Sequence, residues 1–133
     1  MIPRFITAML EDREVCIYGD GEQSRDFTFV DNVVQGNLKA MTAPEAAGET
    51  CNLATGERSS LNNLAMLLGE ILDVTPRIRY EQQRAGDVQH SLADIDKARR
   101  LLGYEPTVTF RAGLEQTVAY FAGLHRNRER SAT

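Results

Sequence analysis

Two arginines lie in loop sequences that suit the recognition of phosphate. Arg25 follows a glycine-rich turn and precedes an aromatic run, so its guanidinium is expected at the mouth of a loop. Arg84 lies in a polar, irregular stretch at residues 82–89, between an expected strand and an expected helix. An arginine fork donates two hydrogen bonds to oxygens in one plane, so two such loops converging on one cleft would suit a diphosphate. Spacing alone leaves the alternative open that both are solvated surface arginines.

Other reactive residue types form no pattern that is typical of catalysis or metal binding. The run GDGEQS at residues 19–24 begins like a dinucleotide fingerprint, but it lacks the third glycine and leads into a strand, so it is interpreted as a turn. The two histidines, His90 and His125, have no zinc-ligand spacing, and no Gly-x-Ser-x-Gly elbow occurs. Cys16 and Cys51 match no metal spacing and are too few for a disulfide scaffold, which favours a reduced cytoplasmic compartment.

Helical and strand patterns alternate along the chain and would position these loops. Apolar residues at helical spacing behind Ser or Asp caps predict helices, and short β-rich runs bounded by turn residues predict strands. The expected helices span residues 3–11, 31–41, 60–71, 94–102 and 110–124, with Asp31, Ser60 and Asp94 as caps and Gly103 after the fourth helix, and the expected strands span residues 15–18, 27–30, 50–54 and 77–81. This order predicts an α+β or α/β layered domain without internal repeats.

The composition indicates one ordinary globular domain. The chain has 133 residues, of which 42% are hydrophobic and 26% charged, and this usage is typical of folded proteins. No apolar run approaches the roughly 20 residues that a membrane-spanning helix needs. The net charge is −4, whereas general binding to a phosphate backbone requires a clustered basic surface. Neither a membrane nor a nucleic acid is therefore expected as a partner.

Several short runs follow one another in the order found in a known enzyme family. They are IPRF at residues 2–5, IYGDGEQSRDF at 17–27 with Asp31 after it, CNLATG at 51–56, RAGD at 84–87, ADIDKA at 93–98 and LGY at 102–104. Over residues 2–122 the chain thereby resembles the extended short-chain dehydrogenase/reductases, the NAD-dependent epimerases and dehydratases of nucleotide sugars. The resemblance implies the C-terminal, substrate-binding portion, an α/β fold of mixed α+β type over residues 1–125 with the Rossmann half absent. A disordered, arginine-rich tail is expected at residues 126–133.

This resemblance implies roles for the residues that would bind the nucleotide. Arg25 and Arg84 would bind the diphosphate, in agreement with the chemistry of the two loops. Asp87 would accept a hydrogen bond on the ribose side of the cleft. Tyr18, together with the backbone near Cys16, would pack against the uracil and supply apolar area and main-chain donors.

The resemblance also implies how the sugar would be accommodated. Ser91 corresponds to a position that lines the hexose pocket near its C2 substituent, where a serine leaves space for an N-acetyl group. Asp26, Phe27 and Asn52 match positions interpreted as structural. The run at residues 86–95 looks most like the bacterial UDP-N-acetylglucosamine 4-epimerases of surface-polysaccharide pathways, although a related decarboxylase or dehydratase would share most of these residues.

The residues needed for hydride transfer in this family are not found in the chain. None of its four tyrosines is followed four positions later by lysine, and no Gly-x-x-Gly-x-x-Gly run follows a strand. The chain alone is therefore expected to bind a UDP-sugar, such as UDP-N-acetylglucosamine or UDP-glucose, without catalysis, and NAD is implied only for the complete family enzyme. The alternative hypothesis is a non-catalytic interaction module that self-associates or pairs with a separate NAD-binding half.

Overall fold

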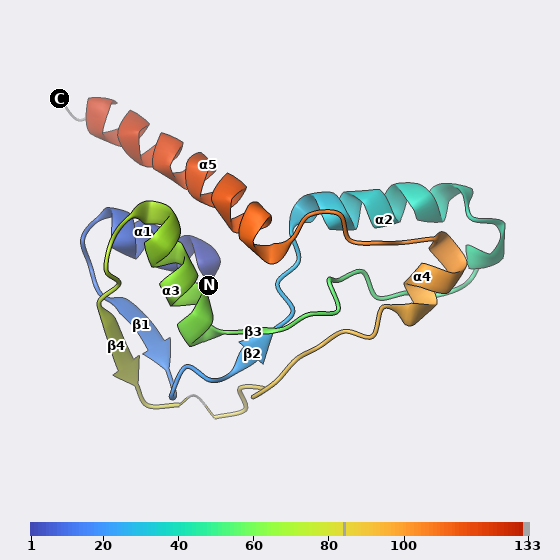
Figure 1. Ribbon diagram of the computed structural model, residues 1–133, viewed down its shortest axis with the longest axis horizontal. Coiled ribbons are helices and arrows are strands. Elements are labelled where there is room, and N and C mark those ends of the chain that lie inside the picture. The colour runs from blue at the N-terminus through green and yellow to red at the C-terminus, as the bar shows by residue number, and fades with distance from the viewer. Residues whose placement is uncertain (84, 132–133) are drawn as a thin grey trace. The chain divides into compact units, whose positions relative to one another are not determined.

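The computed structural model describes residues 1–83 and 85–131, and the chain divides into two units (Figure 1). The first unit comprises Met1–Gln23, Ser60–Gln89 and Leu114–Thr133, and the second comprises Ser24–Ser59 and His90–Gly113. Both are mixed helix and strand structures, which confirms the predicted α/β fold class of mixed α+β type. No helix of the described ranges has the length and apolarity that crossing a membrane would require.

The first unit combines helices with a two-stranded parallel sheet. Its elements are α1 (Ile2–Leu10), β1 (Val15–Tyr18), α3 (Leu61–Leu72), β4 (Ile78–Glu81) and most of α5 (Phe110–Ser131). β1 and β4 are in register from the pair Val15 and Ile78 onward, and α1 packs against both β1 and α3. Parallel strands need a long crossover connection, and α3 is the helical part of that connection inside this unit. The buried apolar side chains of the unit are Phe5, Ile6, Ala8, Met9, Val15, Ile17, Leu61, Leu64, Ala65, Leu68, Leu114 and Val118.

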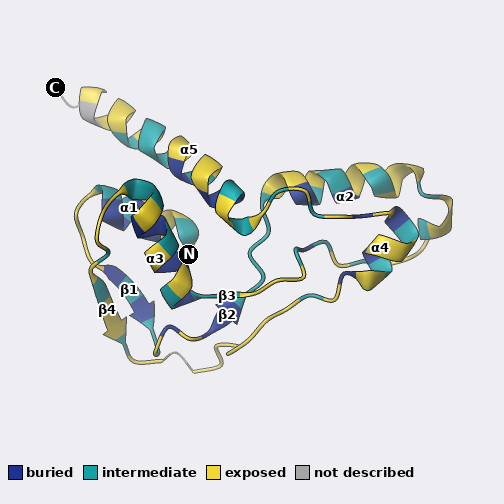
Figure 2. Cartoon of the chain, in the orientation of Figure 1, coloured by how far each residue is buried: buried dark blue, intermediate teal, exposed yellow. Residues whose placement is uncertain are grey.

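The second unit contains two helices and long irregular segments. Its elements are α2 (Val30–Thr42), the short 3₁₀ helix η1 (Pro44–Ala46), α4 (Asp96–Leu102) and the two-residue strand β2 (Ser24–Arg25), which pairs with β3 (Ser59–Ser60). A cluster of buried side chains, Ala54, Ile95, Ala98, Leu102 and Tyr104, forms its core. Figure 2 colours the chain by burial and shows buried positions on α4 in dark blue. Asn32 joins α2 to residues 107 and 108, because its side-chain oxygen accepts from both backbone N–H groups at 2.9 and 3.0 Å.

Several predicted elements are confirmed at nearly their expected bounds. α1, β1, α3, β4 and α4 all lie where the sequence predicts them. Ser60 caps α3, since its hydroxyl accepts a hydrogen bond from the backbone N–H of Asn63 at 3.1 Å. Gly103 ends α4 in the left-handed conformation at φ 59°, as a C-terminal glycine does. α5 continues to Ser131 and so includes most of the segment for which disorder is predicted.

The predicted strands at residues 27–30 and 50–54 are wrong. Residues 26–29 and 51–53 have no regular secondary structure, and α2 already begins at Val30. A β-rich sequence becomes a strand only when a second strand pairs with it, and no strand of the described residues pairs with either segment.

Two of the predicted helix caps are also wrong. Phe29 is the N-terminal cap of α2 and makes no side-chain hydrogen bond to it. Asp31 therefore lies within the first turn, where its negative charge interacts favourably with the positive end of the helix dipole. Ile95 takes the cap position of α4. Asp94 instead lies one residue earlier, where its carboxylate accepts from the backbone N–H of Asp96 at 2.9 Å.

Candidate functional site

In the first unit, β1 ends in a glycine turn that is anchored to the start of α3. The backbone N–H of Asn62 donates to the carbonyl of Gly21 at 3.1 Å, and its side-chain amide donates to the carbonyl of Asp20 at 3.0 Å. A Cβ atom on Gly21, which has φ 81°, would lie 2.0 Å from the Asn62 side-chain oxygen, so only glycine fits there. The same side-chain oxygen of Asn62 accepts a hydrogen bond from the Tyr80 hydroxyl at 2.9 Å. The run at residues 19–24 is therefore a turn, as the sequence predicts.

Cys16 and Tyr18 lie on the less buried face of β1. Burial alternates along the strand, and the intervening Ile17 points into the core. The backbone N–H of Gly19 continues the ladder by donating to the carbonyl of Glu81 at 2.8 Å. Tyr18 therefore stands at the carboxyl end of a parallel strand, which is where ligands bind in parallel α/β sheets. The two residues expected at the uracil share one face at this end.

Asp87, the predicted ribose ligand, is exposed and lies in a stretch without regular secondary structure after β4. Arg84, the second predicted diphosphate ligand, lies outside the described residues.

In the second unit, Ser24 joins the two predicted ligand residues Arg25 and Ser91. The carbonyl oxygen of Ser24 accepts from the Arg25 guanidinium at 2.8 Å and from the backbone N–H of Ser91 at 3.0 Å. The buried Ser24 hydroxyl forms a hydrogen bond with Nδ1 of His90 at 2.9 Å. An isolated parallel bridge between Ser24 and His90 continues this contact along the backbone. We call these four residues the Ser24 junction.

His90 and Asn62 are the structural partners that sequence reasoning missed. Each supports a loop with a predicted ligand residue: His90 lies beside Ser91, and Asn62 holds the turn after Tyr18. Neither residue forms a sequence motif with its partner, because the two members of each pair lie far apart in the chain. The only local signal is the position of Asn62 at the start of a helix, where asparagine is common.

Asp26 anchors a second loop next to the Ser24 junction. Its carboxylate accepts from the backbone N–H of Thr55 at 3.0 Å, from the Thr55 hydroxyl at 2.6 Å and from the backbone N–H of Gly56 at 2.9 Å. A carboxylate whose oxygens are occupied in this way fixes the backbone of a loop. The contacts agree with the structural role that the sequence predicts for Asp26. Asn52 is similarly tied to the backbone, donating to the carbonyl of Asp94 at 3.2 Å.

Tyr104 is a core residue whose hydroxyl is bonded to the backbone. Its side chain is 1% exposed, and its hydroxyl donates to the carbonyl of Ala54 at 2.8 Å. Burial raises the pKa of the Tyr104 phenol above its ordinary value, and the nearby carboxylates of Asp26 and Glu105 raise the pKa further. The phenol therefore stays protonated and bonded within the core.

Among the described residues, no group of three or more histidine, cysteine, aspartate or glutamate side chains is placed to hold a metal ion. In the second unit, the Ser24 junction carries the positive charge of Arg25.

Comparison with known proteins gives consistent matches over most of the chain. The family described as GDP-mannose 4,6 dehydratase matches residues 1–117. An uncharacterised UDP-glucose epimerase of Bacillus subtilis is 33% identical over 123 residues, which cover 92% of this chain and 39% of that protein. UDP-glucuronic acid decarboxylase 1 of Xenopus tropicalis is 31% identical over 121 residues, which cover 91% of this chain and 28% of that protein.

A solved structure shares the fold at similar coverage. The UDP-glucuronic acid 4-epimerase of Bacillus cereus, in complex with UDP-glucuronic acid and NAD, superimposes with a TM-score of 0.88 and 34% identity. The match covers 93% of this chain and 40% of that one. The chain thus spans about two fifths of the length of this structure and of the Bacillus subtilis relative.

Proposed function

Because this chain belongs to the extended short-chain dehydrogenase/reductase family of NAD-dependent nucleotide-sugar epimerases and dehydratases, of which it is a C-terminal portion, we propose that it binds UDP-sugars. In this proposal residues 1–125 are the substrate-binding portion of a UDP-sugar 4-epimerase. The observation that carries the proposal is the Ser24 junction, where one carbonyl oxygen holds both Arg25 and Ser91.

Arg25 would bind the diphosphate. A guanidinium has five N–H donors in a fixed plane, and the bond to Ser24 uses one of its nitrogens while fixing the orientation of the group. Holding the fork in advance lowers the entropic cost of binding an anion. Arg84 is proposed as the second diphosphate ligand, on the strength of the RAGD run alone.

The uracil would lie against the less buried face of β1. Cys16 and Tyr18 share that face, and an aromatic ring beside main-chain donors suits a planar, polar base. Asp87, which is exposed after β4, is proposed to accept a hydrogen bond from the ribose.

Ser91 would line the hexose pocket. Its backbone is fixed by Ser24 and its side chain is small and exposed, so it would leave room beside the C2 substituent of the sugar. An N-acetyl group would then be accepted as readily as a hydroxyl, which supports UDP-N-acetylglucosamine as a substrate.

The residues of this chain do not fit the chemistry of NAD. The family's Tyr-x-x-x-Lys is not found among its four tyrosines, and the most buried of them, Tyr104, has its hydroxyl committed to the carbonyl of Ala54. We therefore propose that the chain by itself binds a UDP-sugar without transferring hydride, and that NAD belongs to the complete family enzyme. Incubation with NAD and UDP-N-acetylglucosamine should produce no absorbance of reduced cofactor, and formation of reduced cofactor would contradict this point.

Calorimetric titration of variants with UDP-N-acetylglucosamine tests the diphosphate assignment. Arg25→Ala and Arg84→Ala should each weaken binding by about 1.5–3 kcal/mol, the scale of a charge-assisted hydrogen bond, or roughly 10- to 150-fold in Kd. Arg58→Ala is the matched control, because Arg58 is an exposed arginine of the same unit as Arg25 with no assigned ligand role. If both ligand variants bind like the parent chain, the diphosphate assignment is wrong.

A nucleotide-sugar decarboxylase or dehydratase is the second candidate for the parent activity, favoured by the similarity to the Xenopus tropicalis decarboxylase. UDP-glucuronic acid in the same titration tests the choice of sugar. Binding at least about tenfold tighter than that of UDP-N-acetylglucosamine would favour an enzyme of UDP-glucuronic acid, either a decarboxylase or a 4-epimerase, over a UDP-N-acetylglucosamine 4-epimerase.

A further inference from the structure

Gln23 is a buried polar residue whose side chain bonds back to the end of β1. Its exposed fraction is 6%, and its side-chain amide donates a hydrogen bond to the carbonyl of Tyr18, five residues earlier in the chain. The carbonyl of Gln23 itself accepts from the backbone N–H of Leu61 at 3.2 Å. Polar side chains that are buried are nearly always hydrogen-bonded, so the Gln23 amide is committed to Tyr18.

The turn between Tyr18 and Gln23 is also held from the side of α3. Asn62 donates its backbone N–H to the carbonyl of Gly21 at 3.1 Å and its side-chain amide to the carbonyl of Asp20 at 3.0 Å. Donors of the first unit thus occupy carbonyl oxygens at both ends and in the middle of the turn. The Tyr18 carbonyl therefore cannot rotate toward a ligand unless the bond to Gln23 breaks.

The main-chain groups of β1 point alternately toward β4 and away from it. The backbone N–H groups of Val15 and Gly19 both donate at 2.8 Å to carbonyl oxygens of residues 77–81. Neighbouring residues of a strand direct their N–H and C=O groups to opposite edges, so those of Cys16 and Tyr18 lie on the edge away from β4. Among the described strands only β4 pairs with β1, and this second edge can offer hydrogen bonds to a base.

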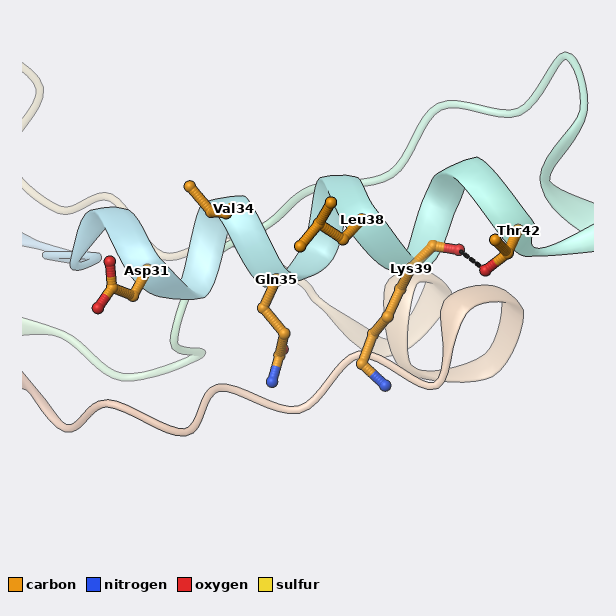
Figure 3. Close-up of a pocket in the computed structure, with 6 residues that line it drawn as sticks. All are labelled: Asp31, Val34, Gln35, Leu38, Lys39 and Thr42. Carbon is orange, nitrogen blue, oxygen red and sulfur yellow. Dashed lines mark hydrogen bonds between the residues drawn. The ribbon is translucent and has the colours of Figure 1, made fainter.

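The groove beside α2 offers a different kind of surface (Figure 3). Its volume is about 410 Å³, and the six residues that line it all belong to α2. The main-chain groups inside a helix bond to one another, so this groove presents mainly side chains to a ligand. The edge of β1 is therefore the better surface for distinguishing one base from another by main-chain hydrogen bonds.

We propose that Gln23 makes the site selective for uracil over cytosine by occupying the Tyr18 carbonyl. The inference rests on the proposed function, in which the uracil lies at this end of β1. The main-chain N–H and C=O of Cys16 complement a carbonyl oxygen and the N3–H of uracil. Cytosine has an amino group where uracil has its 4-oxygen, and this group requires an acceptor. The Tyr18 carbonyl is the next acceptor along the edge, and Gln23 withholds it.

The selectivity follows from the cost of an unpaired donor. An amino group that leaves water without gaining an acceptor weakens binding, whereas the 4-oxygen of uracil needs no acceptor. Gln23 acts through Tyr18 and does not touch the ligand, so it is a positioning residue. Its removal should release the Tyr18 carbonyl as an acceptor for cytosine.

Calorimetric titration with UDP-glucose and CDP-glucose tests the proposal, because the two ligands differ only in the base. The unmodified chain should bind UDP-glucose at least about tenfold more tightly than CDP-glucose. Gln23→Met keeps a long unbranched side chain but cannot donate, and it should reduce this preference to within about threefold. Gln116→Met is the matched control, since Gln116 is exposed on α5 in the same unit and has no assigned ligand role, and it should leave the preference unchanged.

The ratio of the two dissociation constants separates positioning from a purely structural role, because a loosened fold would weaken both ligands alike. An unchanged ratio in Gln23→Met would overturn the proposal, as would equally tight binding of both ligands to the unmodified chain. Failure of the unmodified chain to bind UDP-glucose would instead refute the proposed function, and this inference with it.

A second measurement needs no variant and applies if Gln23→Met loses its circular dichroism. Solvent exchange of the Gln23 side-chain amide protons can be followed by NMR in the unmodified chain. The protons should remain protected when UDP-glucose saturates the protein, because the bond to Tyr18 persists in the complex. Rapid exchange in the complex would show that the Tyr18 carbonyl is released, and the proposal would be wrong.

Discussion

The backbone N–H of Ser91 donates to the carbonyl of Ser24 at 3.0 Å, although the two residues belong to distant parts of the chain. The same carbonyl orients the guanidinium of Arg25. One backbone atom therefore relates a residue proposed for the hexose to one proposed for the diphosphate. Any change that moves Ser24 should affect both parts of the ligand together.

The hydrogen bond between Ser24 and His90 should be measurable as a coupling energy. Ser24→Ala and His90→Ala each remove it, so the double variant should lose little more stability than either single variant. A coupling of about 1 kcal/mol is expected in chemical denaturation, the usual net value of one hydrogen bond. Strictly additive losses would show that the side chains do not interact. Both single variants should also bind UDP-N-acetylglucosamine more weakly, because Arg25 and Ser91 flank the pair.

Two glycines of α5 should respond to alanine in opposite directions. A Cβ atom at Gly113 would lie 2.8 Å from the Cβ of Phe29, an atom that cannot move without its backbone, so Gly113→Ala should lower the thermal midpoint. Gly123 has no atom within 4 Å of the same position, so Gly123→Ala should stabilise the helix by up to about 1 kcal/mol. Calorimetric unfolding of both variants gives the comparison. Equal effects of either sign would contradict the packing of Phe29 against Gly113.

Tyr104 should make stability depend on pH in the alkaline range. The ordinary pKa of its phenol is 10.0, and the folded state raises that pKa chiefly through burial. The unfolded chain therefore loses this proton first, and the stabilisation present below about pH 10 should be lost as the pH rises toward the folded-state pKa.

Tyr104→Phe is the variant that isolates this effect. It should cost about 1–3 kcal/mol at neutral pH, because the buried carbonyl of Ala54 loses its donor. Between about pH 9 and pH 11 its free energy of unfolding should fall less steeply than that of the parent. If the free energies of unfolding of the two proteins fall equally steeply with pH, Tyr104 is not the source of the pH dependence.

Elements that are determined by local sequence could be predicted, and those that depend on distant partners could not. Ser60 caps α3 through a contact three residues away, and β1 alternates between core and surface within four residues. The segments at 27–30 and 50–54 have equally clear β-rich sequences, yet no strand in the described chain pairs with them. The local sequence pattern indicates that a segment prefers the strand conformation, but it does not show whether a second strand is present to pair with it.

In the candidate site too, the residues with a local sequence signal could be predicted and their distant partners could not. The chemistry of its loop and a family resemblance both indicated Arg25, and the resemblance indicated Ser91, but the carbonyl that joins them belongs to Ser24, in the two-residue strand β2. His90 is one of two histidines and has no diagnostic spacing, because its partner lies in β2. A hydrogen bond between distant backbone segments leaves no trace in the spacing of residues.

Calorimetric titration of the unmodified chain with UDP-N-acetylglucosamine, UDP-glucose and dTDP-glucose is the most direct test of whether it binds UDP-sugars. Saturable binding of both UDP ligands is predicted, with UDP-N-acetylglucosamine bound at least as tightly as UDP-glucose and dTDP-glucose bound more weakly than either. The absence of saturable heat with both UDP ligands, or binding of dTDP-glucose as tight as theirs, would contradict the account.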